Sequence, residues 1–283
     1  MSYSTPRRSV LKTGVIALVA AVSLALTGCA TTAAPEAAEG LTTITAGKLT
    51  IGTGLPAYEP WVVGDMPESG EGFEAAVAYA VADQLGFAKE DVVWVRTTFD
   101  EAIAPGLKNF DFNIQQYSIS EERKAAVDFS SPYYETTQVV ITTAASKAAN
   151  AKSLADLKEF AIGAATGTTS FNAIESIIKP TSGARAFNNS DDAKAALIAG
   201  QVDAVVIDLP TAFYLTAVEL DGGKIIGQLE DAGAGDQFGL VLDKGSKLTA
   251  AVTAAVDALR DSGKLQELAD TWLAGYAGAP VLK

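Results

Sequence analysis

The sequence predicts an α/β fold, and three observations support this prediction. From Lys48 onward, short runs rich in β-branched residues alternate with amphipathic stretches, an order typical of helices around mainly parallel sheets. Of the 283 residues, 48% are hydrophobic and 19% are charged, which favours packed cores over a disordered chain. At roughly 100–200 residues per domain, this length predicts about two domains.

The first half of the pattern contains two predicted strands with a helix between them. Residues 49–53 and 91–96 have the composition of strands. Residues 71–85 place apolar side chains such as Phe73 and Val77 on one helical face. Gly86 suits the end of this helix, because glycine adopts the left-handed conformation readily.

The second half repeats the alternation without repeating the sequence. Ser153 and Asp156 have the spacing of a capping box at a helix start. We expect strands at 160–164 and 202–207, and helices at 168–178, 209–219, 247–261 and 263–274.

Composition excludes several function classes. The chain has no histidine and one cysteine, Cys29, so it cannot form a Ser-His-Asp or Cys-His pair, a His/Cys zinc site or an internal disulfide. We therefore expect no catalytic residue, metal ion or cofactor. The net charge of -13 would repel phosphate backbones, which excludes nucleic acid as an expected partner.

The N-terminus predicts export. Residues 1–12 carry Arg7, Arg8 and Lys12 and no acid, and residues 13–26 are almost wholly apolar. This pattern indicates a signal peptide over residues 1–28. A retained membrane anchor is disfavoured, because the apolar run is shorter than the roughly 20 residues of a spanning helix. The arginine pair also resembles a twin-arginine signal, so the export route stays open.

The end of this segment, Leu26-Thr27-Gly28-Cys29, resembles the lipobox of bacterial lipoproteins. The resemblance implies a lipid on Cys29, whereas the alternative is a buried thiol. Two or more acyl chains, at roughly 0.8 kcal/mol per buried methylene, anchor a protein without a transmembrane helix. Residues 29–46 are then the lipidated cysteine and a flexible tether, and the protein is expected on the outer face of the cell membrane.

Four segments in order carry a further resemblance. The run from Phe112 to Tyr134 (FNIQQYSISEERKAAVDFSSPYY) resembles the signature of the polar amino-acid-binding proteins of ABC importers, solute-binding protein family 3. The family's other motifs correspond to Gly72-Phe73-Glu74, Gly167-Thr168-Thr169, and the strand from Gly200 to Asp208. The resemblance covers residues 48–278.

This resemblance implies a two-lobed type II periplasmic-binding-protein fold, with two hinge crossings and a cleft between the lobes. Lobe 1 is expected at 47–138 and 239–283, and lobe 2 at 139–238. The implied function is that of a monomeric extracytoplasmic lipoprotein that captures a polar amino acid by lobe closure and delivers it to an ABC permease. A ligand-sensing lipoprotein and a dehydratase-like enzyme on the same fold are the alternatives.

The resemblance also implies a set of ligand-binding residues. Arg123 is expected to bind the ligand carboxylate bidentately, and its alternative is a surface pair with Glu121 or Glu122. Asp208 is expected to bind the ammonium group, to cap the following helix, or both. The rest of the polar set is Gln116, Ser118, Thr168 and Thr169.

Three further positions relate to the ligand side chain. Tyr58 and Phe99 match aromatic positions that enclose this side chain in the family, although aromatic residues at strand ends are more often core. Gln115 matches a position that faces it. Gly54 stands where binders of basic amino acids tend to carry an acid, which argues against lysine or arginine as the ligand. Gln115 and Gln116 suit a neutral polar ligand such as glutamine.

Overall fold

In this computed structural model, the described residues are 40–230, 235–273 and 278–283. The predicted signal peptide, the lipidated Cys29 and the tether up to residue 39 lie outside them. Among the described residues, no helix combines the length and the apolar character needed to cross a bilayer.

A five-stranded sheet forms the centre of the part that we call lobe 1. Its strand order is β2-β1-β3-β10-β4. The strands are β1 (Leu49–Gly54), β2 (Val92–Thr97), β3 (Phe112–Asn113), β4 (Val127–Thr136) and β10 (Asp236–Asp243). Strand β1 runs parallel to β2 and β3, and β10 is antiparallel to β3 and β4. The strands predicted at 49–53 and 91–96 are confirmed to within one residue.

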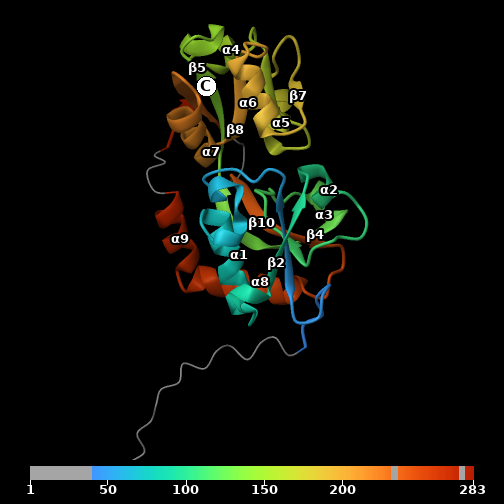
Figure 1. Ribbon diagram of the computed structural model, residues 1–283. Coiled ribbons are helices and arrows are strands. Elements are labelled where there is room, and N and C mark those ends of the chain that lie inside the picture. The colour runs from blue at the N-terminus through green and yellow to red at the C-terminus, as the bar shows by residue number, and fades with distance from the viewer. Residues whose placement is uncertain (1–39, 231–234, 274–277) are drawn as a thin grey trace, which may run out of the picture. The chain divides into compact units, whose positions relative to one another are not determined.

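The helices of lobe 1 pack on this sheet and on one another (Figure 1). They are α1 (Phe73–Gln84), α2 (Phe99–Ile103), α3 (Glu121–Lys124), α8 (Thr249–Asp261) and α9 (Lys264–Trp272). Helix α1 buries Phe73, Val77 and Val81 in a core that also contains Trp61 and Phe238. The predicted helices are therefore confirmed, and Gly86 has the expected positive φ of 83° directly after α1.

A six-stranded sheet forms the centre of lobe 2, in the order β11-β9-β5-β8-β6-β7. The strands are β5 (Gln138–Thr143), β6 (Ile162–Ala165), β7 (Arg185–Phe187), β8 (Ala204–Asp208), β9 (Gly223–Leu229) and β11 (Val281–Leu282). Both faces of this sheet are covered, because alternate residues of β8 belong to different apolar clusters: Val206 to one, Val205 and Ile207 to the other. Burial on both faces explains the continuous apolar run in the sequence.

The helices of lobe 2 are short. They are α4 (Leu154–Leu157), α5 (Thr169–Ala173), α6 (Ser190–Ile198) and α7 (Leu209–Tyr214). Single π-helical turns, at Ile174–Ile178 and Leu215–Glu219, continue α5 and α7, so the helices predicted at 168–178 and 209–219 are confirmed as mixed helices. The capping box of Ser153 and Asp156 is also present.

The prediction of mainly parallel sheets is confirmed only in part, because antiparallel strand pairs lie beside the parallel ones in each sheet. The chain leaves β4 and continues into β5 through a single residue, Thr137. Strand β5 therefore enters lobe 2 antiparallel to both of its neighbours, β8 and β9. Strand β10 likewise returns to lobe 1 between β3 and β4, antiparallel to both. Strand direction is thus set at the two crossings.

The expected domain boundaries differ from the structure at two places. Val281 and Leu282, expected in lobe 1, pair with β9 of lobe 2, so the C-terminal end lies among the elements of lobe 2 (Figure 1). The chain thereby passes between the lobes a third time. The expected tether is also shorter, because Leu41 packs on the lobe 1 core and the Ile44 N–H donates to Asp111 Oδ1 (2.8 Å).

Candidate functional site

A cavity of about 150 Å³ is lined by residues of both lobes. Every residue expected to bind ligand lines it, namely Tyr58, Phe99, Gln115, Gln116, Ser118, Arg123, Thr168, Thr169 and Asp208. The sequence analysis did not single out other polar residues of its wall, which are Thr98, Ser170, Asn188, Asn189 and Ser190. The run Asn188-Asn189-Ser190-Asp191 carries an N-cap signal that could have identified the last three of these residues. The cap is formed, since Asn189 Oδ1 accepts from the Asp192 N–H (2.8 Å).

The position of the cavity follows from the sheets. Leu55 and Thr98 directly follow β1 and β2 in lobe 1, while Ala165, Asn188 and Asp208 lie at or just beyond the ends of β6, β7 and β8 in lobe 2. The carboxyl ends of neighbouring parallel strands meet at one edge of a sheet, which is where open α/β sheets bind ligands. The two sheets thus present such edges to the same cavity.

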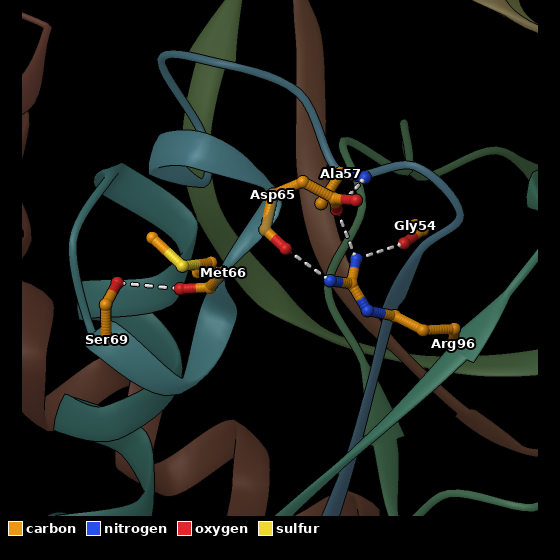
Figure 2. Close-up of polar contacts among 6 residues, drawn as sticks. All are labelled: Gly54, Ala57, Asp65, Met66, Ser69 and Arg96. Carbon is orange, nitrogen blue, oxygen red and sulfur yellow. Dashed lines mark hydrogen bonds and ion pairs between the residues drawn. The ribbon is translucent and has the colours of Figure 1, made fainter.

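The loop after β1, which carries Tyr58, is held by Arg96 of β2. The Arg96 guanidinium donates to the Gly54 carbonyl (2.7 Å), to Asp65 Oδ1 (2.6 Å) and to the Asp65 carbonyl (2.5 Å). Asp65 Oδ1 also accepts from the Ala57 N–H (2.8 Å), as Figure 2 shows. These contacts join the two ends of the loop, so its conformation is fixed by groups outside the cavity.

Arg123 is buried at the cavity wall. Its guanidinium donates to the carbonyls of Ser118 (2.6 Å) and, across the lobes, of Gly167 (2.9 Å), and it lies 5.3 Å from the centre of the Phe99 ring. Burial lowers the pKa of Arg123, yet arginine remains a cation at neutral pH. The alternative surface pair with Glu121 is not formed, because Glu121 binds Lys124 (2.8 Å).

Thr168 and Thr169 begin α5 on the lobe 2 side. The Thr168 hydroxyl caps the helix, accepting from the Phe171 N–H (3.1 Å) and donating to the Ala165 carbonyl (2.7 Å). The Thr169 hydroxyl lies 3.2 Å from that of Ser118 in lobe 1. The two threonines therefore differ: Thr168 positions the turn, and Thr169 presents its hydroxyl to the other lobe.

Asp208 is partly buried at the end of β8. It occupies the N-cap position of α7 but makes no side-chain capping bond, so the expected capping role is not formed. Oδ1 accepts from Gln138 Nε2 (2.7 Å) instead. Burial, and then the nearby Asp236, raise the pKa of Asp208 to about 8. The carboxyl group of Asp208 thus makes no capping bond to α7, and it can accept hydrogen bonds from a cationic ligand.

Glu74, which the sequence analysis noted only as part of a motif, lies beneath Gln116. Its buried carboxylate accepts from the Gln116 N–H (2.8 Å), from the Gln116 amide and from the Tyr133 hydroxyl. Burial raises the pKa of Glu74 to about 7. These bonds hold Gln116 at its positive φ of 49° and direct its amide to Glu74, a contact that sequence analysis did not anticipate.

Gln115 and the aromatic residues shape the remaining wall. The side-chain Oε1 of Gln115 accepts from the Tyr117 hydroxyl (2.8 Å). A Cβ at Gly54 would lie 2.6 Å from the Pro56 carbonyl oxygen and 3.0 Å from Gln115 Nε2, so no side chain fits there without rearrangement. Phe99 packs on Tyr117 at a ring distance of 4.5 Å, and burial raises the pKa of Tyr58 to about 12. Phe99 and Tyr58 both line the cavity.

Comparison with known proteins places these features in context. The sequence profile of the bacterial extracellular solute-binding proteins, family 3, matches residues 49–275. The chain is 31% identical over 229 residues to the L-arginine-binding protein of Pseudomonas aeruginosa, covering 76% of this chain and 84% of that protein. It is 29% identical over 213 residues to the ABC transporter glutamine-binding protein GlnH of Bacillus subtilis, covering 73% and 75%.

The fold is similar to that of solved structures. An ancestral arginine-binding protein bound to glutamine matches with a TM-score of 0.69 and 30% sequence identity. The match covers 81% of this chain and 99% of that protein, so it includes both lobes and the cavity.

Proposed function

Since the chain belongs to the bacterial extracellular solute-binding proteins, family 3, we propose that it captures a polar amino acid with an uncharged side chain. In this proposal it acts outside the cytoplasm, as a monomer, and delivers the ligand to an ABC permease. The relatives described above are binding proteins, which supports binding rather than catalysis.

The observation that carries this proposal is the pair of charges in the cavity wall. Of the described residues that line the cavity, Arg123 is the cation and Asp208 is the acid, whose carboxyl group becomes an anion when it binds a cationic group. An α-amino acid carries one charge of each sign on neighbouring atoms, so the two residues match its carboxylate and its ammonium group. A guanidinium binds a carboxylate through two parallel hydrogen bonds. The ligand carboxylate would replace the Gly167 carbonyl as a partner of Arg123.

The uncharged side chain is inferred from what remains of the wall. The polar residues outside this charge pair, such as Gln115, Asn188 and Ser190, are neutral. Because the Gln115 amide and the Pro56 carbonyl occupy the space beside Gly54, an acid at that position has no room. A basic side chain would therefore be desolvated without a partner, which is unfavourable. Glutamine is the ligand that we infer.

In this proposal, ligand binding is coupled to closure of the two lobes. Hydrogen bonds that join the lobes include those from Arg123 to Gly167 (2.9 Å), between Ser118 and Thr169 (3.2 Å), and from Trp61 Nε1 to Thr211 Oγ1 (2.8 Å). A ligand that contacts Arg123 of lobe 1 and Asp208 of lobe 2 binds this closed arrangement more tightly than an open one. It therefore shifts the population toward closure.

A thermal-shift screen of the mature protein over the standard amino acids tests the proposal. A ligand at 100 times its Kd stabilises the folded state by about 2.7 kcal/mol, so the binder should raise the melting temperature clearly. We expect the largest shift with a neutral polar amino acid. A largest shift with arginine or lysine would contradict the proposed specificity, and no shift with any amino acid would contradict the function.

We also propose that Cys29 carries the lipid that anchors the protein. Replacing Cys29 with alanine should leave the folded body intact and release it from the membrane fraction, because the described residues contain no helix able to span a bilayer. Fractionation of cells that express either form measures the outcome. Retention of the Cys29→Ala protein in washed membranes would show that a different segment provides the anchor.

A further inference from the structure

A second carboxylate lies behind the charge pair of the cavity. Asp236 is the first residue of β10, where the chain returns to lobe 1. Its Oδ2 accepts from Gln138 Nε2 (2.5 Å) and from the Thr169 hydroxyl (2.8 Å). The same Gln138 nitrogen donates to Asp208 Oδ1 (2.7 Å). One amide group therefore bridges two carboxylates.

The backbone fixes this arrangement at the first two crossings between the lobes. Gln138 begins β5 and pairs with Asp208 in the strand register, while Asp236 pairs with Thr136 at the end of β4. The Ser170 hydroxyl donates to the side-chain Oε1 of Gln138 (2.6 Å), which leaves the amide nitrogen directed at the two carboxylates. The orientation of the amide is thus determined by its hydrogen bonds.

Asp236 does not line the ligand cavity. It lines a separate cavity of about 170 Å³, together with Gln138 and Thr169. A ligand in the first cavity would therefore contact Asp208 and Thr169, and Asp236 would act on it through them.

A second carboxylate in such proximity disfavours the ionised form of Asp208. After burial, Asp236 is the main cause that raises the pKa of Asp208. Two other charged or titratable groups act on Asp208: Glu74 of α1 adds to the effect, and Arg123 of α3 opposes it. Asp208 in turn contributes to the raised pKa of the Tyr133 hydroxyl of β4. The positive charge of a ligand ammonium group would interact favourably with these carboxyl groups.

We propose that Asp236 is a positioning residue of the amino-acid site, which acts on Asp208 across their shared Gln138 amide and thereby makes ligand capture dependent on pH. This inference rests on the proposed function. When the ligand arrives, the Asp208 O–H bond breaks, the proton passes to the solvent buffer, and the carboxylate accepts from the ligand ammonium.

The pH dependence has a definite sign. The ligand needs ionised Asp208, so below its pKa in the empty protein the affinity falls about tenfold per pH unit, and above it the affinity is constant. Glu74 titrates in a similar range, but its pKa is set by burial, Tyr133 and Gln116. Removing the charge of Asp236 therefore changes the titration of Asp208 selectively.

The test compares Asp236→Asn with the wild type by calorimetric titration with L-glutamine, or with the amino acid that the thermal screen selects, between about pH 5.5 and 8.5. The asparagine oxygen can still accept from Gln138 and Thr169, so the change removes charge and preserves shape. We expect the midpoint of affinity against pH to move down by about one unit. In buffers of different protonation enthalpy near neutral pH, the variant should release fewer protons on binding.

Asp261→Asn is the matched control, because Asp261 is exposed at the end of α8 and outside the cavity, and it should leave the midpoint unchanged. Asp236→Glu keeps the charge and should therefore retain the wild-type midpoint. If Asp236→Asn does not fold, Asp236→Ser serves as the charge-removing variant. An unchanged midpoint in the charge-removing variant, with or without a lower melting temperature, would overturn the role of Asp236 and leave the proposed function intact. Absence of binding by the wild type at every pH would overturn both.

Discussion

Replacing Arg123 with alanine is expected to weaken amino-acid binding by about 2–5 kcal/mol. The guanidinium is the cation of the described cavity wall, and without it the ligand carboxylate would be desolvated and unpaired. The variant also loses two hydrogen bonds to the carbonyls of Ser118 and Gly167. Its stability should therefore fall by about 1–3 kcal/mol, which denaturant unfolding measures separately from binding.

Arg185→Ala is the matched control for this experiment. Arg185 lies exposed on β7 and does not line the cavity, so its removal takes away the same charge without touching the ligand. Calorimetric titration of both variants should show a large loss in one and none in the other. Affinity of Arg123→Ala within about a factor of three of the wild type, less than 1 kcal/mol, would refute the carboxylate assignment.

Asp208→Asn is expected to reduce affinity by more than about tenfold, or roughly 1.4 kcal/mol. Asparagine keeps the shape of the side chain and an oxygen that can accept from Gln138, but it removes the charge that the ligand ammonium requires. Because Asp208 makes no capping bond to α7, its loss should not lower the stability of lobe 2.

The same substitution has a defined effect on stability against pH. The pKa of Asp208 rises from 3.8 to about 8 on folding. A raised pKa means that the unfolded state releases its proton first, so the contribution of this group is fully present below about pH 4 and is lost as pH rises through about 8. The melting temperature of Asp208→Asn relative to the wild type should therefore increase from about pH 5 to 8. A lower melting temperature with unchanged affinity would support the capping role instead.

Much of the fold could be predicted from local pattern. The continuous apolar run of residues 202–207 is stable only as a strand with both of its faces buried. The structure places this run in the sheet at the centre of lobe 2. The capping box at Ser153 and the glycine after α1 were equally local signals. The mixed strand direction in the two sheets gave no local signal, because it depends on where the chain crosses between the lobes. Strand β11 is two residues long, too short for any pattern, and its pairing with β9 is a long-range contact.

The site divides in the same way. Residues such as Arg123 and Asp208 stand in recognisable motifs, and the structure brings them to one cavity. The contact of Glu74 with Gln116 does not follow from the motif in which Glu74 stands. Gln138 and Asp236 lie far apart in the chain, and they acquire a role only when the strands align. Single residues of this kind carry no periodic or compositional signal. Tertiary structure is needed to reveal them.

Calorimetric titration of the mature protein with L-glutamine, and with its analogue that lacks the α-amino group, tests the central claim most directly. The arrangement of Arg123 and Asp208 predicts binding of one glutamine per chain, and at least about tenfold weaker binding of the analogue, since the analogue leaves Asp208 without a cation. Equal affinity for the two compounds, or no binding of glutamine or of any other amino acid, would contradict the assignment of this cavity as an amino-acid site.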